Sequence, residues 1–131
     1  MVADKPTILV VEDDDLMQAM IQEAMTDGGF EIGLAPTGEQ AVTLLTEAEG
    51  KYVALVTDIN LLGRIDGWQV AKHAREIDPQ FPIVYMTGAS ADAWGANGVP
   101  NSILLTKPFA PAQLLTAVSQ LLNAPPTGAP T

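Results

Sequence analysis

The chain has 131 residues, of which 16 are acidic and 6 basic, so its formal net charge is −10. This balance argues against a broad basic surface that would bind nucleic acid or an anionic membrane. Because the chain has no cysteine, it cannot form a disulfide or a thiolate metal site. Neither a signal peptide nor an apolar segment of membrane-spanning length is evident, so we expect a cytoplasmic protein.

Short apolar runs alternate along the chain with segments of helical period. Glycine, proline and asparagine separate these segments and indicate where each one ends. The expected elements, in chain order, are a strand at 8–11, a helix at 14–27, a strand at 30–35, a helix between 37 and 50, a strand at 52–57, a helix at 67–77, a strand at 83–86, a short weak helix at 89–95, a strand at 103–105 and a helix at 110–122.

Continuously apolar strands between amphipathic helices predict a parallel sheet covered on both faces. With right-handed crossovers, this α/β order predicts a doubly wound, flavodoxin-like five-stranded parallel sheet of order 2-1-3-4-5 with five helices. The fourth helix is expected to be short or irregular. We expect an N-terminal extension at 1–6, one domain at 7–123 and a disordered Pro-rich tail at 124–131.

Polar side chains follow four of the expected strands at the point where each strand ends. They are Glu12 and Asp13 after the first strand, Asp58 after the third, Thr87 after the fourth and Lys107 after the fifth. Because the carboxyl ends of parallel strands meet at one edge of the sheet, we expect these groups to lie close together. Taken singly, each has an ordinary explanation as a helix cap, a strand end or a surface charge, but their common placement favours a functional site.

The acidic members of this set predict a divalent cation site. Carboxylates that converge are unfavourable unless a cation lies among them. Hard oxygen ligands favour Mg²⁺, and we expect Glu12 and Asp13 to serve it while Asp14 caps the following helix. Asp58 could act as a nucleophile that forms an acyl phosphate.

Four motifs in this order resemble the receiver (CheY-like) domains of bacterial two-component response regulators, over about residues 7–122. The motifs are ILVVEDD at 8–14, VTDINLLGRIDGW at 56–68, VYMTGAS at 84–90 and TKPF at 106–109. Each motif alone is weak evidence, but the four together at family-like spacing are strong evidence. The resemblance implies a phosphorelay switch rather than an enzyme, with only self-phosphorylation and slow auto-dephosphorylation.

The resemblance implies that Asp58 accepts a phosphoryl group from a histidine kinase or a histidine phosphotransfer protein. Thr87 matches the switch hydroxyl of the family, and Lys107 matches the lysine that pairs with the phosphate. The Lys107–Pro108 peptide bond is typically cis in these proteins. The downstream partner implied is another protein, which the sequence does not identify.

The resemblance also implies a magnesium ligand set. Glu12 and Asp13 match the acidic pair of the family. Together with Asp58 and the backbone carbonyl of Asn60 they would bind Mg²⁺. No other cofactor is implied.

Several positions depart from the family pattern. The loop after Asp58 has Leu62-Gly63 where Pro-Gly is common, and it is one residue longer than the commonest form. Leu104 stands where the family usually has the aromatic switch residue, so that switch has no ring to move. Ala89 offers no polar group on the path of the hydrolytic water.

Alternative interpretations remain open at this stage. The domain could be a single-domain regulator or a receiver from a hybrid histidine kinase or larger regulator. Leu104 and the thin fourth helix favour a phosphate-independent pseudo-receiver, but the intact set of Glu12, Asp13, Asp58, Thr87 and Lys107 argues more strongly against it. An aspartyl-phosphate phosphohydrolase would commonly have a second acid where this chain has Asn60. His73, the single histidine, is expected to be exposed and to have no catalytic role.

Overall fold

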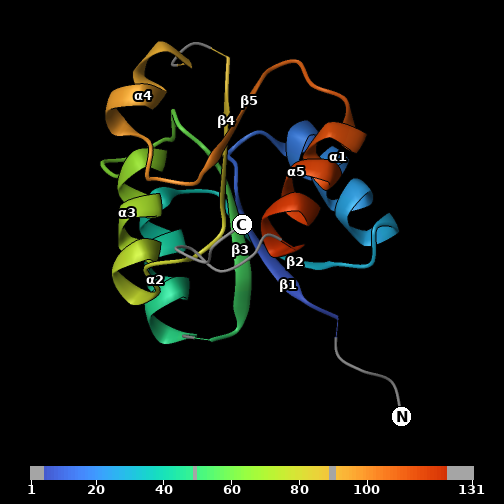
Figure 1. The fold of residues 1–131 in the computed structure, drawn as a ribbon, viewed down its shortest axis with the longest axis horizontal. Coiled ribbons are helices and arrows are strands. Elements are labelled where there is room, and N and C mark those ends of the chain that lie inside the picture. The colour runs from blue at the N-terminus through green and yellow to red at the C-terminus, as the bar shows by residue number, and fades with distance from the viewer. Residues whose placement is uncertain (1–4, 49, 89–90, 124–131) are drawn as a thin grey trace, which may run out of the picture.

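The computed structural model describes residues 5–48, 50–88 and 91–123. It contains five parallel strands in the order β2-β1-β3-β4-β5 (Figure 1), which confirms the predicted doubly wound sheet. The strands are β1 (Thr7–Val11), β2 (Glu31–Ala35), β3 (Tyr52–Asp58), β4 (Ile83–Thr87) and β5 (Ile103–Thr106). The predicted tail at 124–131, most of the predicted N-terminal extension and Ala89 lie outside the described residues.

The helices follow the predicted order, and the fourth is short as expected. They are α1 (Asp15–Asp27), α2 (Gly38–Glu47), α3 (Gly67–Ile77), a 3₁₀ turn η1 (Ala91–Ala93), α4 (Trp94–Asn97) and α5 (Pro111–Asn123). None of the helices in the described part of the chain has the length and hydropathy to cross a membrane.

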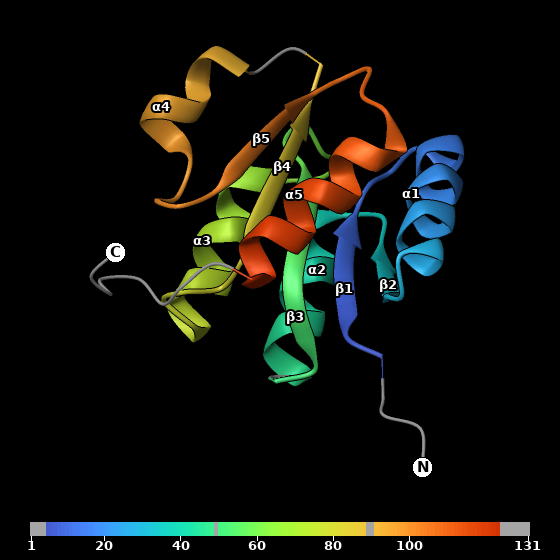
Figure 2. The ribbon, with the colours of Figure 1, turned by 45° about the vertical axis from the view of Figure 1, so that its right-hand side comes forward.

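The helices cover the sheet on both faces. Helices α2, α3 and α4 lie on one side of it, and α1 and α5 lie on the other (Figures 1 and 2). Side chains alternate along each strand, so that Leu55 enters the core under α2 and α3 while Ala54 and Val56 enter the core under α1 and α5. The central strands are buried on both faces, which explains their continuous apolar sequences.

Side-chain caps fix where two of the helices begin. The Asp14 carboxylate accepts hydrogen bonds from the backbone N–H of Leu16 at 2.8 Å and of Met17 at 3.2 Å, as predicted for the cap of α1. Asp66 and Gln69 form a capping box at the start of α3. Both caps lie at the carboxyl edge of the sheet, where they set the direction of the chain next to the predicted site.

In its described part, residues 91–102, the segment between β4 and β5 has few regular backbone hydrogen bonds, because glycine and asparagine are weak helix formers. The Trp94 indole N–H donates to Ser102 Oγ at 3.0 Å, and Ser102 Oγ donates to the Val99 carbonyl at 2.6 Å. On the α3 side, the Arg75 guanidinium donates to the Pro100 carbonyl at 2.7 Å. Side-chain hydrogen bonds therefore hold much of the conformation of this segment.

His73 is half-buried, so the expectation that it is exposed was wrong. Its side chain is 29% exposed, and its Nε2 lies 2.9 Å from Thr46 Oγ1 of the neighbouring α2. Its position beside Lys72 and Arg75 in the sequence indicates a solvent-exposed face, but α2 packs beside α3 and covers part of it. Its contacts are with α2 and with Glu76 of its own helix, away from the carboxyl edge of the sheet.

Candidate functional site

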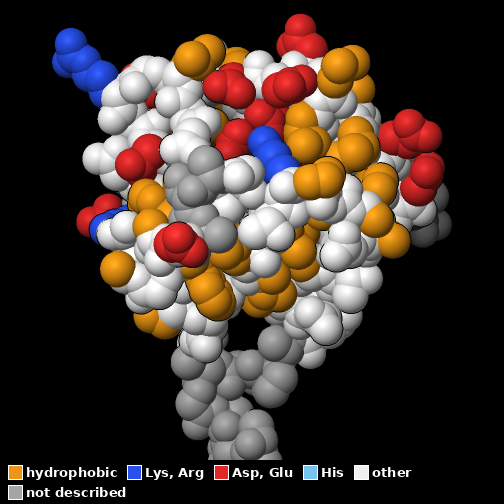
Figure 3. Space-filling model, turned by 90° about the horizontal axis from the view of Figure 1, so that it is seen from above, with side chains coloured by type: hydrophobic (Ala, Val, Ile, Leu, Met, Phe, Trp, Pro, Cys, Tyr) orange, Lys and Arg blue, Asp and Glu red, His pale blue; other side chains and the backbone are white. Residues whose placement is uncertain are grey.

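The predicted site residues come together at the carboxyl edge of the sheet. Glu12 follows β1 directly, Asp58 and Thr87 are the last residues of β3 and β4, and Lys107 follows β5. Seen from above, acidic side chains gather beside a basic one, with hydrophobic side chains around them (Figure 3). The sheet order places β3 between β1 and β4, so Asp58 lies at the centre of the group.

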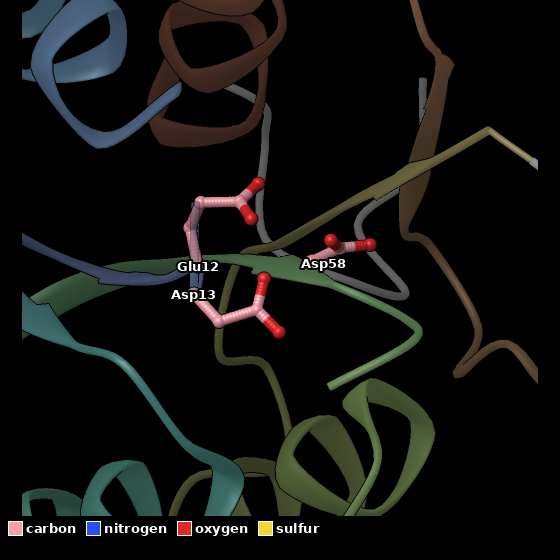
Figure 4. Close-up of side chains that lie close together, drawn as sticks. All are labelled: Glu12, Asp13 and Asp58. Carbon is pink, nitrogen blue, oxygen red and sulfur yellow. The ribbon is translucent and has the colours of Figure 1, made fainter. Parts of the chain in front are cut away.

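Three carboxylates form a compact acidic cluster, Glu12, Asp13 and Asp58, which extend from β1 and β3 into one space (Figure 4). One oxygen from each lies within 4.8 Å of the others. Glu12 is fully buried, Asp58 is 8% exposed and Asp13 is half-buried. Like charges this close repel one another unless a cation lies among them, and the all-oxygen donor set has the chemistry that Mg²⁺ prefers.

Lys107 already places one positive charge against the cluster. Its Nζ lies 3.0 Å from Glu12 Oε1 and 3.0 Å from Asp58 Oδ2. Burial alone would lower the pKa of Lys107, but the hydrogen bonds to the two carboxylates outweigh burial and raise it. Lys107 is therefore held as the ammonium ion, a fixed donor beside Asp58.

Burial has the opposite consequence for Glu12. Removal of its carboxylate from water raises its pKa, and the hydrogen bond from Lys107 offsets part of that rise. The backbone N–H of Asp14 donates to Glu12 Oε2 at 3.1 Å, and the Gln18 side chain donates to the Glu12 carbonyl at 2.5 Å. Sequence analysis missed Gln18, although its place in the first turn of α1 puts it near the end of β1.

The backbone at Asp58 is fixed from two sides. Thr57 Oγ1 donates to the Asp58 carbonyl at 2.8 Å. Gly67 packs so closely that a Cβ at this position would lie 2.2 Å from the same carbonyl oxygen, and its N–H donates to the Ile59 carbonyl at 2.9 Å. The Asp66-Gly67 pair of the sequence thus closes the loop that follows Asp58, and only glycine fits there.

The β4 and β5 ends complete the site. Thr87 is fully buried, and its carbonyl accepts a hydrogen bond from the Lys107 N–H at 2.7 Å. The Lys107–Pro108 peptide bond is cis, as predicted. Asn60, the fourth predicted magnesium ligand, lies exposed in the loop that begins directly after Asp58.

An aromatic ring does lie near Leu104, on the neighbouring strand. Tyr85 of β4 pairs in register with Leu104 of β5 and is fully buried. Its ring packs on Trp68 with centroids 4.7 Å apart, and its hydroxyl accepts a hydrogen bond from the Val99 N–H at 3.1 Å. Burial raises the pKa of Tyr85. Sequence analysis missed this residue, which the aromatic position two before Thr87 could have indicated.

Comparison with known proteins gives the family. Residues 8–119 match the response regulator receiver domain, and the chain belongs to that family. It is 30% identical over 119 residues to the response regulator receiver protein CpdR of Brucella abortus, a match that covers 89% of this chain and 97% of CpdR. It is also 27% identical to the sensor kinase CckA of the same organism, but spans only 12% of that protein.

Solved structures agree with this result. A response regulator receiver protein from Sinorhizobium medicae is 46% identical, covers 92% of this chain and 97% of its own, and superposes with a TM-score of 0.89. The receiver domain of the sensor histidine kinase PA1611 from Pseudomonas aeruginosa is 25% identical, with a TM-score of 0.78 over 92% of this chain and 100% of its own, and it has a magnesium ion coordinated in its active site cleft.

The family defines the class of function. Receiver domains are signalling switches of two-component systems, and phosphorylation by a kinase is their general function. They interact with histidine kinases and phosphotransfer partners. The acidic cluster of this chain fits the magnesium site of receiver domains.

Proposed function

We propose that Asp58 is the phosphoacceptor of this receiver and that it takes a phosphoryl group from a phosphohistidine. The observation that carries the proposal is the position of its carboxylate: Oδ2 lies 3.0 Å from Lys107 Nζ and within the acidic cluster. A carboxylate oxygen attacks phosphorus as the bond between phosphorus and the donor imidazole nitrogen breaks, and that nitrogen regains a proton as the histidine leaves.

The surrounding residues hold the phosphoryl group. The Lys107 ammonium pairs with a phosphoryl oxygen, and the Thr87 hydroxyl donates to another. Glu12, Asp13, Asp58 and the Asn60 carbonyl would hold Mg²⁺. When bound, the ion offsets negative charge on the transferring group. The burial of Glu12 and Asp58 keeps the site low in dielectric, which strengthens each of these interactions.

The partners follow from the same chemistry. The donor is a histidine kinase or a histidine phosphotransfer protein in the cytoplasm, and the output is a change in contacts with a downstream protein rather than with nucleic acid or a membrane. This chain spans 97% of the length of CpdR but only 12% of the length of CckA. The proposal is therefore made for the receiver domain, as a single-domain regulator or as part of a longer protein.

Intact-protein mass spectrometry after incubation with acetyl phosphate tests the proposal. We expect one added phosphoryl group, formed only when Mg²⁺ is present and absent from Asp58→Asn. Asp15→Asn, in the exposed first turn of α1, is the matched control and should be labelled like the wild type. Failure of the wild type to take up phosphate with Mg²⁺ would overturn the proposal and favour a phosphate-independent module. Steady release of phosphate from small esters would favour a hydrolase.

A further inference from the structure

The loop that joins β3 to α3 carries a predicted magnesium ligand but contains no proline to restrict its backbone. It runs from Ile59 to Asp66 and contains Asn60. Proline at position 62 would restrict the backbone, whereas this chain has Leu62 there. The position of the Asn60 carbonyl therefore depends on how the rest of the loop is anchored.

Glu39, in the first turn of α2, binds the middle of this loop. Its Oε2 accepts a hydrogen bond from the Arg64 backbone N–H at 3.1 Å. The carboxylate also lies against Gly63, where the backbone has φ +96° and a Cβ would lie 2.7 Å from Oε2. The hydrogen bond from the Arg64 N–H is the main cause that lowers the pKa of Glu39, so the loop is bound by a charged acceptor.

Gly38 brings α2 close enough for this contact. A Cβ at Gly38 would lie 2.4 Å from the Ile65 carbonyl oxygen and 2.9 Å from Ile65 Cβ. Ile65 packs against the core between the sheet and α2 and α3, which lie side by side on this face (Figures 1 and 2). Glycine at 38 and glutamate at 39 thus act together: one permits the approach and the other makes the bond.

We propose that Glu39 is a positioning residue for the metal site, because it holds the 59–66 loop in the conformation that presents the Asn60 carbonyl. The inference rests on the proposed function, in which that carbonyl binds Mg²⁺. Glu39 is not a member of the acidic cluster of Glu12, Asp13 and Asp58. Its effect passes through the loop backbone, in the way that outer groups orient the direct ligands of a metal.

The Mg²⁺ dissociation constant, measured by tryptophan fluorescence without any phosphodonor, tests the proposal. Trp68 lies directly after Gly67, where the loop ends, so its fluorescence should change when the loop moves. We expect Glu39→Ala to raise the dissociation constant about tenfold and to speed amide hydrogen exchange at Arg64 and Ile65 in the metal-free protein. Glu39→Gln keeps an acceptor oxygen and should recover most of the affinity. Labelling by acetyl phosphate should slow in Glu39→Ala at low Mg²⁺ and recover at saturating Mg²⁺.

Glu47→Ala is the matched control, since it removes the same charge from the other end of α2. Gly38→Ala is an independent second variant. It should also raise the Mg²⁺ dissociation constant, because the added Cβ would push Ile65 away from α2. Faster exchange with unchanged Mg²⁺ affinity in Glu39→Ala would overturn the proposal, as would an equal loss in Glu47→Ala. Absence of phosphate uptake by the wild type would instead defeat the proposed function, and it would leave the metal and exchange measurements to decide the role of Glu39.

Discussion

Lys107 Nζ lies 3.0 Å from Glu12 Oε1, although 95 residues separate the two in the sequence. Two strands, β3 and β4, lie between the strands that these residues follow. The lysine therefore reaches across the carboxyl edge of the sheet and contacts Asp58 on the way. Its ammonium is the positive charge that allows these two buried carboxylates to be neighbours.

Replacement of this ammonium should destabilise the metal-free protein. In Lys107→Met, Glu12 and Asp58 face each other with no positive charge. Loss of one partner from a buried ion pair costs about 3–5 kcal/mol, which we reduce to about 2 kcal/mol because Lys107 is 23% exposed. Urea unfolding with a chelator should show this loss in the free energy of unfolding. Addition of Mg²⁺ should make the loss smaller. An equal loss in Lys72→Met, on exposed α3 surface, would contradict the explanation.

Removal of one carboxylate from the acidic cluster should weaken the binding of Mg²⁺. Asp13→Asn keeps the shape of the side chain but removes one of three carboxylates that lie within 4.8 Å. We expect the Mg²⁺ dissociation constant, measured by titration calorimetry, to rise by more than about tenfold. Asp15→Asn, two residues along, changes the net charge equally outside the cluster. Similar weakening by both variants would show that general charge, rather than direct ligation, controls the affinity.

The cap of α1 can be tested separately from the site. Asp14→Ala removes the acceptor for two backbone N–H groups and should lower the free energy of unfolding by about 1 kcal/mol. Urea unfolding followed by circular dichroism measures the change. Asp15→Ala loses only the weaker attraction to the start of the helix and should lose less. An unchanged stability in Asp14→Ala would mean that solvent satisfies these groups equally well.

Tyr85→Phe should loosen the segment before β5. The change removes the acceptor of the half-buried Val99 N–H and should cost about 1 kcal/mol of stability. Amide exchange at Val99 should become faster, while exchange in β3 should stay as slow as in the wild type. Tyr52→Phe, at the start of β3 with its hydroxyl near Gly33 of β2, removes a hydroxyl elsewhere and should leave Val99 unaffected.

Glu39 should make stability depend on pH in a defined direction. Its folded-state pKa is lowered, first by the Arg64 N–H, from the ordinary value of 4.5. The unfolded chain thus binds the proton more readily, so the contribution is fully present above pH 4.5 and disappears as pH falls through the lowered folded-state value. The difference in Tm between wild type and Glu39→Gln should accordingly be seen at pH 7 and shrink below pH 4.5. A difference independent of pH would refute the charged bond.

Much of the fold follows from local signals in the sequence. The period of the apolar residues predicts the third helix over 67–77, as the structure has it. Asp14 was recognised as a cap because its side chain can reach the next backbone N–H groups. The acidic cluster and Lys107 also came together as predicted, since strand ends in a parallel sheet share one edge.

Contacts between elements were beyond this reasoning. The hydrogen bond of Tyr85 to Val99 and the contact of His73 with Thr46 depend on how far one element slides past another. Periodicity shows which face of a helix is buried, but it does not show which residue of the neighbour it meets. The same is true of Glu39, whose partner lies 25 positions away. The roles of Thr87 and Asn60 remain predictions.

Strand β3 supplies side chains to the cores on both faces of the sheet, whereas Ala93 and Val99 of the segment before β5 pack against one core alone. Unfolding of β3 would expose both cores together, so its amides should be among the last in the molecule to exchange. Local unfolding of the 91–102 segment should expose side chains of one core only, so its amides should exchange sooner. Asp58 therefore lies at the end of the strand that we expect to unfold last, whereas the 91–102 segment should rearrange more readily.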